Sequence, residues 1–323
     1  MVKPLIIINH AAAKARRAWP IVREQLSTAQ IEFDVYQTTC PGDATTRTRA
    51  ALHSGVTTIA VVGGDGTLSE AAAGFFQFNT DLGKCPALIN PEAALSILPA
   101  GTGDDFARGL MKRRAPLQTW VQILIGHCRG AENSMQVCDV LYGRCDNYET
   151  PFICLNASTM GIGGETARRV AAQGPFMRSL SGEVRFAAAA LRSLAGWRER
   201  RARVTVAEVT YEGKMNLAAV ANGLYAGGGM ILSPQAKIND GKLDVVTASG
   251  LGRVNIIREL GRIHKGGHIA NPSVRVTQGT CARIETFNSQ DAMPIEVDGN
   301  VRGVTAVEFV VMPSALRVVF DKH

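Results

Sequence analysis

Residues 60–70, AVVGGDGTLSE, place three glycines around one aspartate, between an apolar run and the start of a helix. The run TIAVV (58–62) is continuously apolar, which is typical of a strand buried on both faces. Glycines after such a strand let backbone amides approach an anion, and a helix N-terminus adds positive potential. Thr67 and Glu70 have the spacing of a capping box. The stretch is therefore either a phosphate-binding loop or a tight turn with a solvent-facing Asp65.

Asp65 is an unusual residue for a simple phosphate loop, because a carboxylate repels the anion. It fits a nucleotide site if it holds a metal ion or removes a proton from a hydroxyl nucleophile. No lysine follows the glycines, and the GxGxxG pattern is absent, so the loop is neither a Walker A motif nor a dinucleotide fingerprint.

A second stretch of the same design, LSILPAGTGDDFARGL (95–110), runs from an apolar strand through Gly101, Thr102 and Gly103 into a helix. Asp104 and Asp105 fall in the first turn of that helix, where carboxylates also favour the helix dipole. The carboxyl ends of parallel strands share one edge of a sheet, and ligands bind at that edge in open α/β folds. Two such turns indicate a ligand site more strongly than one.

The rest of the chain divides into two parts that differ in their pattern of apolar and helical segments. Up to about residue 130, short apolar runs such as LIIIN (5–9) alternate with helical segments, which predicts a parallel sheet with helices on both faces. Beyond it, short strand-like pieces and one helix (182–200) follow, which predicts an antiparallel sandwich. The turn signals among these pieces are Glu212-Gly213, Asp240-Gly241 and Asp298-Gly299.

The composition is that of a globular protein, with 46% hydrophobic and 20% charged residues among 323. No apolar run approaches the roughly 20 residues of a spanning helix, and LIIIN is too brief for a signal peptide, so we expect a cytoplasmic protein. Seven cysteines without CxxC spacing indicate neither a disulfide framework nor a zinc site. The net charge of +7, concentrated at 112–114 and 198–203, is either a solvated surface or an attraction for polyanions.

These motifs together resemble a known family. GGDGTLSE is similar to the GGDGT-x-NE loop, and LPAGTGDDFARGL to the GTGNDFAR loop, of soluble lipid kinases with a diacylglycerol-kinase catalytic domain, which include bacterial diacylglycerol kinases and sphingosine kinases. Three later segments follow in the family's order, so the resemblance covers nearly the whole chain: NASTMGIGGE (156–165), NGLYAGGGMILSPQAKINDGKLDVV (222–246) and IEVDGN (295–300).

The resemblance implies a fold in two domains with the active site in the cleft between them. Residues 1–130 would form a doubly wound α/β nucleotide-binding domain of the NAD kinase and diacylglycerol kinase type. Residues 131–309 would form an antiparallel β-sandwich that takes the lipid substrate. The final segment, about 310–323, would return to the first domain.

The implied reaction is transfer of the γ-phosphoryl group of ATP to a lipid hydroxyl, diacylglycerol-like or sphingoid, with Mg²⁺ screening the phosphates. ATP and a lipid are then the partners, with transient contact at a membrane surface and no nucleic acid. Residues 192–203, with Phe186, Leu191, Leu194 and Trp197, form either that membrane contact or one buried helix face. The sequence identifies neither the acceptor nor the oligomeric state.

By position, the resemblance implies a set of nucleotide contacts: Asn9, Thr38, Gly63, Gly64, Asp65, Gly66, Thr67, Gly101 and Thr102. The segment KINDGKL (237–243) is similar to the family's magnesium loop. There Asp240 would supply a carboxylate, and Lys237 and Lys242 their backbone carbonyls. The alternative for Asp240 is an Asp-Gly hairpin turn.

Three departures from the family pattern bear on activity. The opening Asn-Pro turn is Asn9-His10, and the asparagine of GTGND is Asp104, which adds a negative charge. The family's late DGE motif, whose glutamate is usually assigned as the proton acceptor, is Asp298-Gly299-Asn300. An amide cannot act as a general base.

If catalysis survives this change, Asp65 is the first candidate base and Asp105 the second. Glu296, two residues before Asp298, is taken as a poor substitute. Two alternatives to a lipid kinase stay open at this point. One is a nucleotide-binding regulator with impaired catalysis, which Asn300 suggests. The other is an NAD kinase.

Overall fold

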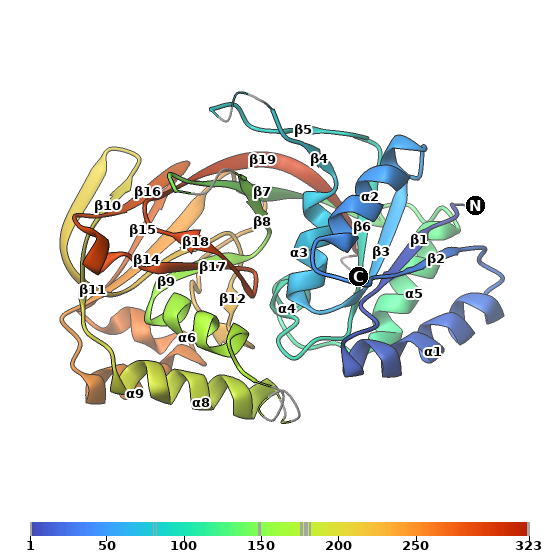
Figure 1. The fold of residues 1–323 in the computed structure, drawn as a ribbon. Coiled ribbons are helices and arrows are strands. Elements are labelled where there is room, and N and C mark those ends of the chain that lie inside the picture. Colours follow the sequence, from blue (N-terminus) through green and yellow to red (C-terminus); the bar gives the residue numbers. More distant parts are fainter. Residues whose placement is uncertain are drawn as a thin grey trace. The chain divides into compact units, whose positions relative to one another are not determined.

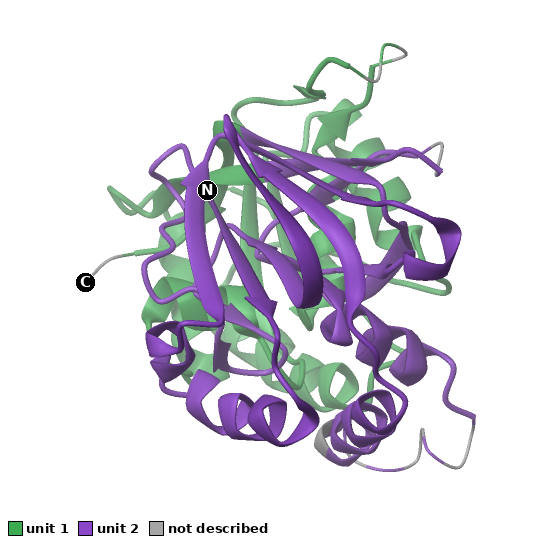
Figure 2. Ribbon diagram, turned by 90° about the vertical axis from the view of Figure 1, so that its left-hand side faces the viewer, with its two compact units in different colours: residues 1–140, 312–323 green, residues 141–311 purple. Residues whose placement is uncertain are grey.

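The computed structural model describes residues 2–321 except 80, 82, 148, 149, 175, 176, 178, 179 and 181. The chain forms two compact units, Met1–Val140 with Met312–His323, and Leu141–Val311 (Figure 2). Residues 1, 322 and 323, which the sequence assigns to the nucleotide-binding domain, lie outside the described residues.

The first unit is built on a parallel sheet whose central strands are buried at every position except Pro99 at the end of β6. Its strand order is β2-β1-β3-β6-β19, and all neighbours in it are parallel. The strands are β1 (Leu5–Ile8), β2 (Asp34–Gln37), β3 (Thr58–Gly63), β6 (Ala94–Pro99) and the last part of β19 (Val307–Val319). The apolar runs seen in the sequence are these strands, because a sheet covered on both faces needs apolar residues at every position.

Helices cover both faces of this sheet (Figure 1). Contacting pairs are α1 (Ala13–Thr28) with α5 (Leu117–Cys128), and α2 (Asp43–His53) with α3 (Asp65–Ala73). The short helix α4 (Asp105–Met111) follows β6, and a small hairpin joins β4 (Phe76–Gln77) to β5 (Ala87–Leu88). The predicted doubly wound α/β fold is confirmed.

The register of the sheet brings the strand ends together. Ile8, the last residue of β1, pairs with Gln37 of β2 and Val62 of β3, and Gly63 pairs with Pro99 of β6. The residues that follow these strands therefore meet along one edge, where open α/β sheets bind ligands.

The second unit is mainly antiparallel, as the sequence predicts. Its strands are β7 (Met135–Cys145), β8 (Phe152–Cys154), β9 (Ala157–Gly161), β10 (Arg200–Val206), β11 (Val209–Ala221), β12 (Tyr225–Ala226), β13 (Met230–Ile231), β14 (Leu243–Ser249), β15 (Val274–Gly279), β16 (Cys281–Thr286), β17 (Pro294–Val297) and β18 (Asn300–Val304). Strand β7 begins in the first unit, and β19 ends there.

Residues 218–221 at the end of β11 are buried on both faces, which explains their small apolar side chains. Ala218 and Val220 enter the core between the strands, where Phe152 packs edge-on against Phe309 at 5.8 Å. Ala219, on the other face, packs in a second cluster with residues of two helices. The sandwich is thus covered by a helical layer: α6 (Ile162–Ala171), α8 (Gly182–Ala195) and α9 (Arg253–Ile263).

Several local predictions were wrong. Helix α8 ends at Ala195 rather than at residue 200, and α6 and α9 were not predicted. Glu212-Gly213 lies inside β11 rather than in a turn; the hairpin turn lies at residues 207 and 208, where Ala207 has a φ of +50°. Alanine is an uncommon residue for such a turn, so the sequence carried no signal for it.

None of the helices in the described part of the chain has the length and apolar character needed to cross a membrane.

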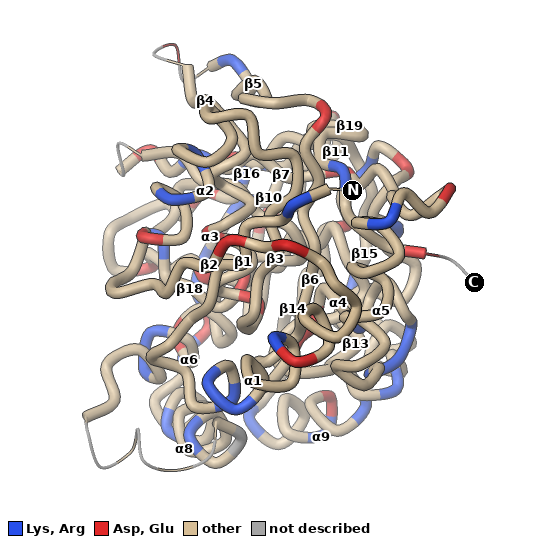
Figure 3. The backbone as a smooth tube through the Cα atoms, turned by 90° about the vertical axis from the view of Figure 1, so that its right-hand side faces the viewer, with Lys and Arg blue, Asp and Glu red and all other residues tan. Residues whose placement is uncertain are grey.

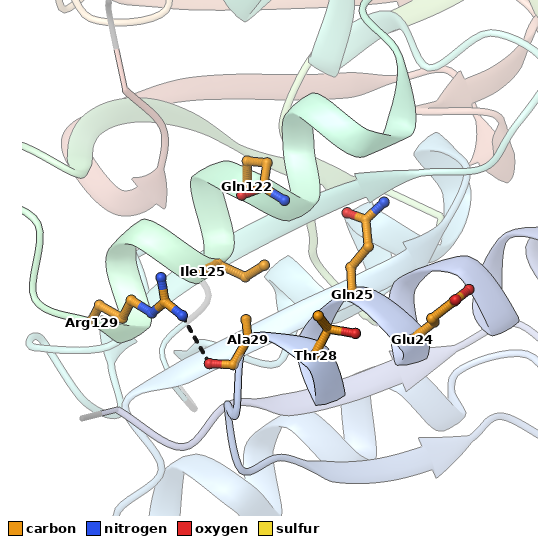
Figure 4. Close-up of a pocket in the computed structure, with 7 residues that line it drawn as sticks. All are labelled: Glu24, Gln25, Thr28, Ala29, Gln122, Ile125 and Arg129. Carbon is orange, nitrogen blue, oxygen red and sulfur yellow. Dashed lines mark hydrogen bonds between the residues drawn. The ribbon is translucent and has the colours of Figure 1, made fainter.

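A hollow of about 490 Å³ lies between α1 and α5 (Figure 4). Its α1 residues are at the C-terminal end of that helix, and Arg129, just after α5, donates to the carbonyl of Ala29 at 2.9 Å. Because α1 runs back from the carboxyl end of β1, this hollow lies toward the opposite edge of the sheet from the glycine loops. It is lined by Glu24, Gln25, Thr28, Ala29, Gln122, Ile125 and Arg129.

We predict that Gly74→Ala destabilises the first unit. A Cβ at Gly74, just after α3, would lie 2.5 Å from Thr48 Cβ and 2.7 Å from the Thr45 carbonyl oxygen of α2. Such overpacking lowers the free energy of unfolding by about 1–3 kcal/mol, measurable by urea denaturation. The control Gly109→Ala meets nothing within 4 Å and should stabilise by about 0.5–1 kcal/mol. Equal effects of the two substitutions would contradict this prediction.

Candidate active site

The two glycine loops touch through their backbones. A Cβ built on Gly64 would lie 3.0 Å from Gly101 Cα, and one built on Gly101 would lie 2.6 Å from Gly64 Cα. Neither Gly64 nor Gly101 can therefore be replaced by a larger residue unless the two loops move apart. This contact explains why both loops keep glycine at the point where β3 and β6 end.

Asp65 reaches from the first loop to the helix that follows the second. Its Oδ1 accepts a hydrogen bond from the Phe106 amide at 3.2 Å, in the first turn of α4. Burial raises the pKa of Asp65, while hydrogen bonds from the Asp105 and Phe106 amides partly oppose that rise. Asp65 is thus a partly desolvated carboxylate whose position is fixed by the start of α4. Asp105 is buried at the first position of the same helix.

The predicted capping box is wrong. Helix α3 begins at Asp65, so Thr67 is its third residue rather than its cap. The Thr67 hydroxyl accepts from Asn9 Nδ2 at 2.9 Å, and the Glu70 carboxylate accepts from the Gly42 amide at 3.0 Å. These side chains join neighbouring loops of the sheet edge, a use that local spacing cannot reveal.

Asp104 lies beside Asp65 in an unfavourable electrostatic position. It is 6% exposed, and its backbone has a φ of +53°. Its Oδ1 accepts from the Gly101 amide at 2.7 Å, and its Oδ2 lies 3.5 Å from Arg114. Burial, and next the charge of Asp65, raise the pKa of Asp104 to about 6. Asp104 therefore stabilises the second loop best when it is protonated.

The remaining predicted nucleotide contacts lie at the same edge. Asn9 follows β1, and the Thr38 hydroxyl donates to the Ile8 carbonyl at 3.3 Å. Gly63 ends β3, Gly66 lies in the first turn of α3, and Thr102 lies in the second loop.

Two cations at the second loop were not predicted as site residues. Lys14 Nζ donates to the Gly101 carbonyl at 3.2 Å, and Arg114 pairs with Asp104. Lys14 comes from the first turn of α1, so a lysine soon after the first strand was the signal available. Arg114 also lines a hollow of about 380 Å³ with Asp104, Arg108 and Trp120.

In the second unit, Asp298 has a structural position. Asp298-Gly299 forms the two-residue turn between β17 and β18, and both residues have positive φ, as in a type I′ hairpin. The carboxylate is 5% exposed. It accepts hydrogen bonds from the amides of Leu155, Asn156 and Ala157 at 2.8, 2.9 and 3.1 Å. This aspartate therefore ties the hairpin to the segment before β9.

Asn300 begins β18, opposite Val297. Its Nδ2 is buried and has no hydrogen-bond partner within the described residues. Glu296 accepts from the Thr159 hydroxyl at 2.7 Å and from the Gly299 amide. Residues two apart on a strand share a face, and Asp298 lies in the turn after the strand, so alternation gives no reason to exclude Glu296.

The segment 237–242 is a turn that leads into β14. Asp240 is exposed, its Oδ1 accepts from the Lys242 amide at 3.0 Å, and Gly241 has a φ of +72°. The hairpin alternative is wrong, because β14 pairs with β11 and β15 and not with the preceding β13. The exposed Asp240 carboxylate supplies oxygen donors of the kind that Mg²⁺ prefers. Across the described residues, no group of three or more His, Cys, Asp or Glu side chains could hold a metal.

Comparisons with known proteins match two parts of the chain to two family models. Residues 3–139 match the diacylglycerol kinase catalytic domain, and residues 159–320 match the YegS C-terminal NAD kinase beta sandwich-like domain. The chain belongs to the diacylglycerol kinase catalytic-domain family.

Several relatives of the chain carry the name "Probable lipid kinase YegS-like". The protein from Xanthomonas euvesicatoria pv. vesicatoria (strain 85-10) is 28% identical over 300 residues, 92% of this chain and 90% of the relative. The one from Xanthomonas campestris pv. campestris (strain 8004) is 30% identical over 237 residues, 73% and 70% of the two chains.

Solved structures share the fold. A diacylglycerol kinase from Bacillus anthracis str. Sterne has a TM-score of 0.67 at 18% identity, covering 99% of this chain and 97% of that one. Another structure from the same strain has a TM-score of 0.75 at 20% identity, covering 99% and 98%.

We predict that Asp104→Asn stabilises the protein above pH 6. The folded-state pKa of about 6 exceeds the ordinary 3.8, so the fold favours the protonated acid, and this stabilisation is lost as pH rises from about 4 through 6. The asparagine keeps an oxygen for the Gly101 amide but carries no charge. Urea denaturation should show the variant roughly 2–3 kcal/mol more stable at pH 7.5 and no more stable at pH 3.5. A difference that is the same at both pH values would rule out the electrostatic explanation.

Proposed function

We propose that this protein is an ATP-dependent lipid kinase that transfers the γ-phosphoryl group to a lipid hydroxyl, diacylglycerol-like or sphingoid. The observation that supports this proposal is the backbone contact of Gly64 with Gly101, which gathers two glycine loops and a partly desolvated Asp65 at one sheet edge. Membership of a family whose relatives are named lipid kinases supports it further.

The phosphates of ATP would lie against the backbone of residues 63–66 and 101–103. Amide groups in glycine loops and at helix starts favour anions. Lys14, held at the Gly101 carbonyl, adds a cation at this position. The hydrogen bond from Asn9 to Thr67 holds the start of α3 against the end of β1. Thr38 and Thr102 complete the set of proposed contacts.

Asp65 would act as the proton acceptor. As the lipid oxygen attacks the γ-phosphorus and ADP leaves, the hydroxyl proton passes to the Asp65 carboxylate, so the charge on the attacking oxygen is relieved. The raised pKa of Asp65 makes it a better acceptor than an ordinary exposed aspartate. Asp105, buried one residue before Phe106, is the second candidate.

Magnesium bound with ATP supplies neutralisation of phosphate charge during transfer. We propose in addition that Asp240, with the carbonyls of Lys237 and Lys242, holds a Mg²⁺ ion in the second unit. The exposed Asp240 carboxylate, in the turn before β14, supports that assignment and contributes the negative charge.

We predict that Asp65→Asn lowers kcat at least 100-fold while the KM for ATP changes less than threefold, because the amide keeps the hydrogen bond from Phe106 but accepts no proton. In the unaltered enzyme, kcat should fall as pH falls through the raised pKa of Asp65, since protonation removes the base. The measurement is transfer of radiolabel from ATP with Mg²⁺ to diacylglycerol, a sphingoid base or phosphatidylglycerol in mixed micelles, with NAD as a further acceptor.

The matched control is Asp34→Asn, which removes an exposed carboxylate paired with Lys3 and should leave kcat unchanged. Label in none of the lipids would overturn the proposed function. Label in NAD would replace it with an NAD kinase. A small loss in Asp65→Asn together with a large loss in Asp105→Asn would transfer the base role to Asp105.

A second candidate function is nucleotide binding without efficient turnover, as in a regulator. Asn300, whose buried Nδ2 has no partner in the described part of the chain, favours it because no carboxylate stands at that position. On this hypothesis calorimetry shows ATP binding without turnover, and Asn300→Glu raises turnover at least tenfold. Robust activity in the unaltered protein that Asn300→Glu does not change would reject the regulator.

A further inference from the structure

Helix α9 of the second unit carries apolar side chains on two opposite faces. Its inner face, with Ile256 and Ile263, packs in the cluster that also holds Leu194 of α8. On its outer face, Val254 is 80% exposed and Ile257 is 54% exposed. A surface helix of a globular protein normally turns polar residues outward, so this outer face has no explanation in the fold.

The outer face is also basic. Arg253, Arg258, Arg262 and Lys265 are exposed, and Figure 3 shows basic positions along α9. The one acidic residue of the helix, Glu259, is buried and accepts hydrogen bonds from Arg262 and Asn271 at 3.1 and 2.9 Å. The outer face of α9 thus presents apolar and cationic groups without an exposed carboxylate.

We propose that this face docks the protein on an anionic lipid surface, with the helix lying in the plane of the interface. Apolar side chains would enter the boundary between headgroups and acyl chains, and the cations would contact lipid phosphates. A second copy of the chain is a poorer occupant, because a two-fold contact would bring the cations of one α9 against those of the other.

The α9 face replaces part of the surface that the sequence indicated. Leu194 and Trp197 are buried, as one of the two sequence readings expected. Arg198 pairs with Asp291 at 3.1 Å and Arg200 donates to the Gln290 carbonyl, so these arginines stabilise the second unit itself. Leu191 of α8 is exposed, and α8 packs through Leu194 in the same cluster as α9.

Docking of this kind would bring the enzyme to an acceptor that resides in a bilayer, and this clause rests on the proposed function. Binding to vesicles needs neither ATP nor turnover, so it is measured separately. If the protein binds anionic vesicles but phosphorylates no lipid, the docking proposal stands and the proposed kinase activity fails. If the protein phosphorylates micellar lipid but does not bind vesicles, the proposed kinase activity stands and the docking proposal fails.

The test is co-sedimentation of the full chain with vesicles of phosphatidylcholine containing 30% phosphatidylglycerol, at about 0.1 M salt, against vesicles of phosphatidylcholine alone. Arg253→Gln with Arg258→Gln should lower the partition coefficient about 25-fold, since each cation near an anionic surface contributes roughly fivefold. The matched control, Arg17→Gln with Arg23→Gln on α1, removes the same charge from another exposed helix and should change binding less than twofold.

The apolar contribution is tested by Ile257→Asn, which should lower binding at least threefold, with Ile21→Asn on α1 as its control. Equal losses in target and control variants would overturn the proposal, as would binding to neutral vesicles that matches binding to anionic ones. A concentration-dependent dimer that Ile257→Asn dissolves would show that a second copy covers the face, which also overturns it.

Discussion

The backbone contact between Gly64 and Gly101 is the constraint on which the candidate site depends. Parallel pairing of β3 with β6 brings the two strand ends together, but only residues without a Cβ let the loops close to this distance. Once the loops touch, Asp65 of the first reaches the start of α4, which follows the second. The geometry of the site therefore depends jointly on the sheet register, on the two glycines and on the position of α4.

Closing the loops also concentrates negative charge. Asp104 is buried and Asp65 is partly buried, and the charge of Asp65 adds to burial in raising the pKa of Asp104. Backbone amides and the nearby Arg114 offset part of this repulsion. A site that repels its own carboxylates favours whatever cation or proton relieves them. That property suits a reaction in which a proton leaves a hydroxyl beside phosphate.

Much of this arrangement could be read from the sequence, for identifiable reasons. Strands buried on both faces leave continuous apolar runs, so the parallel sheet and its loops were predictable around 58–70 and 95–110. Side-chain partners far apart in the chain were not predictable. The bond from Asn9 to Thr67 and the bond from Lys14 to Gly101 depend on register and helix placement, which spacing along the chain does not encode. The turn at Ala207 was missed because its backbone departs from the usual preference of its residue.

The buried carboxylate of Asp298 has a consequence for how this chain can vary. Three backbone amides donate to this carboxylate, and an Asp-Gly pair suits the type I′ turn, so the pair has a role in the hairpin that does not depend on the neighbouring position. Position 300 is free of that requirement, and an asparagine there leaves the hairpin intact. An Asp-Gly pair at this point of the chain is therefore a sign of the hairpin fold, and by itself says little about which chemistry the chain performs.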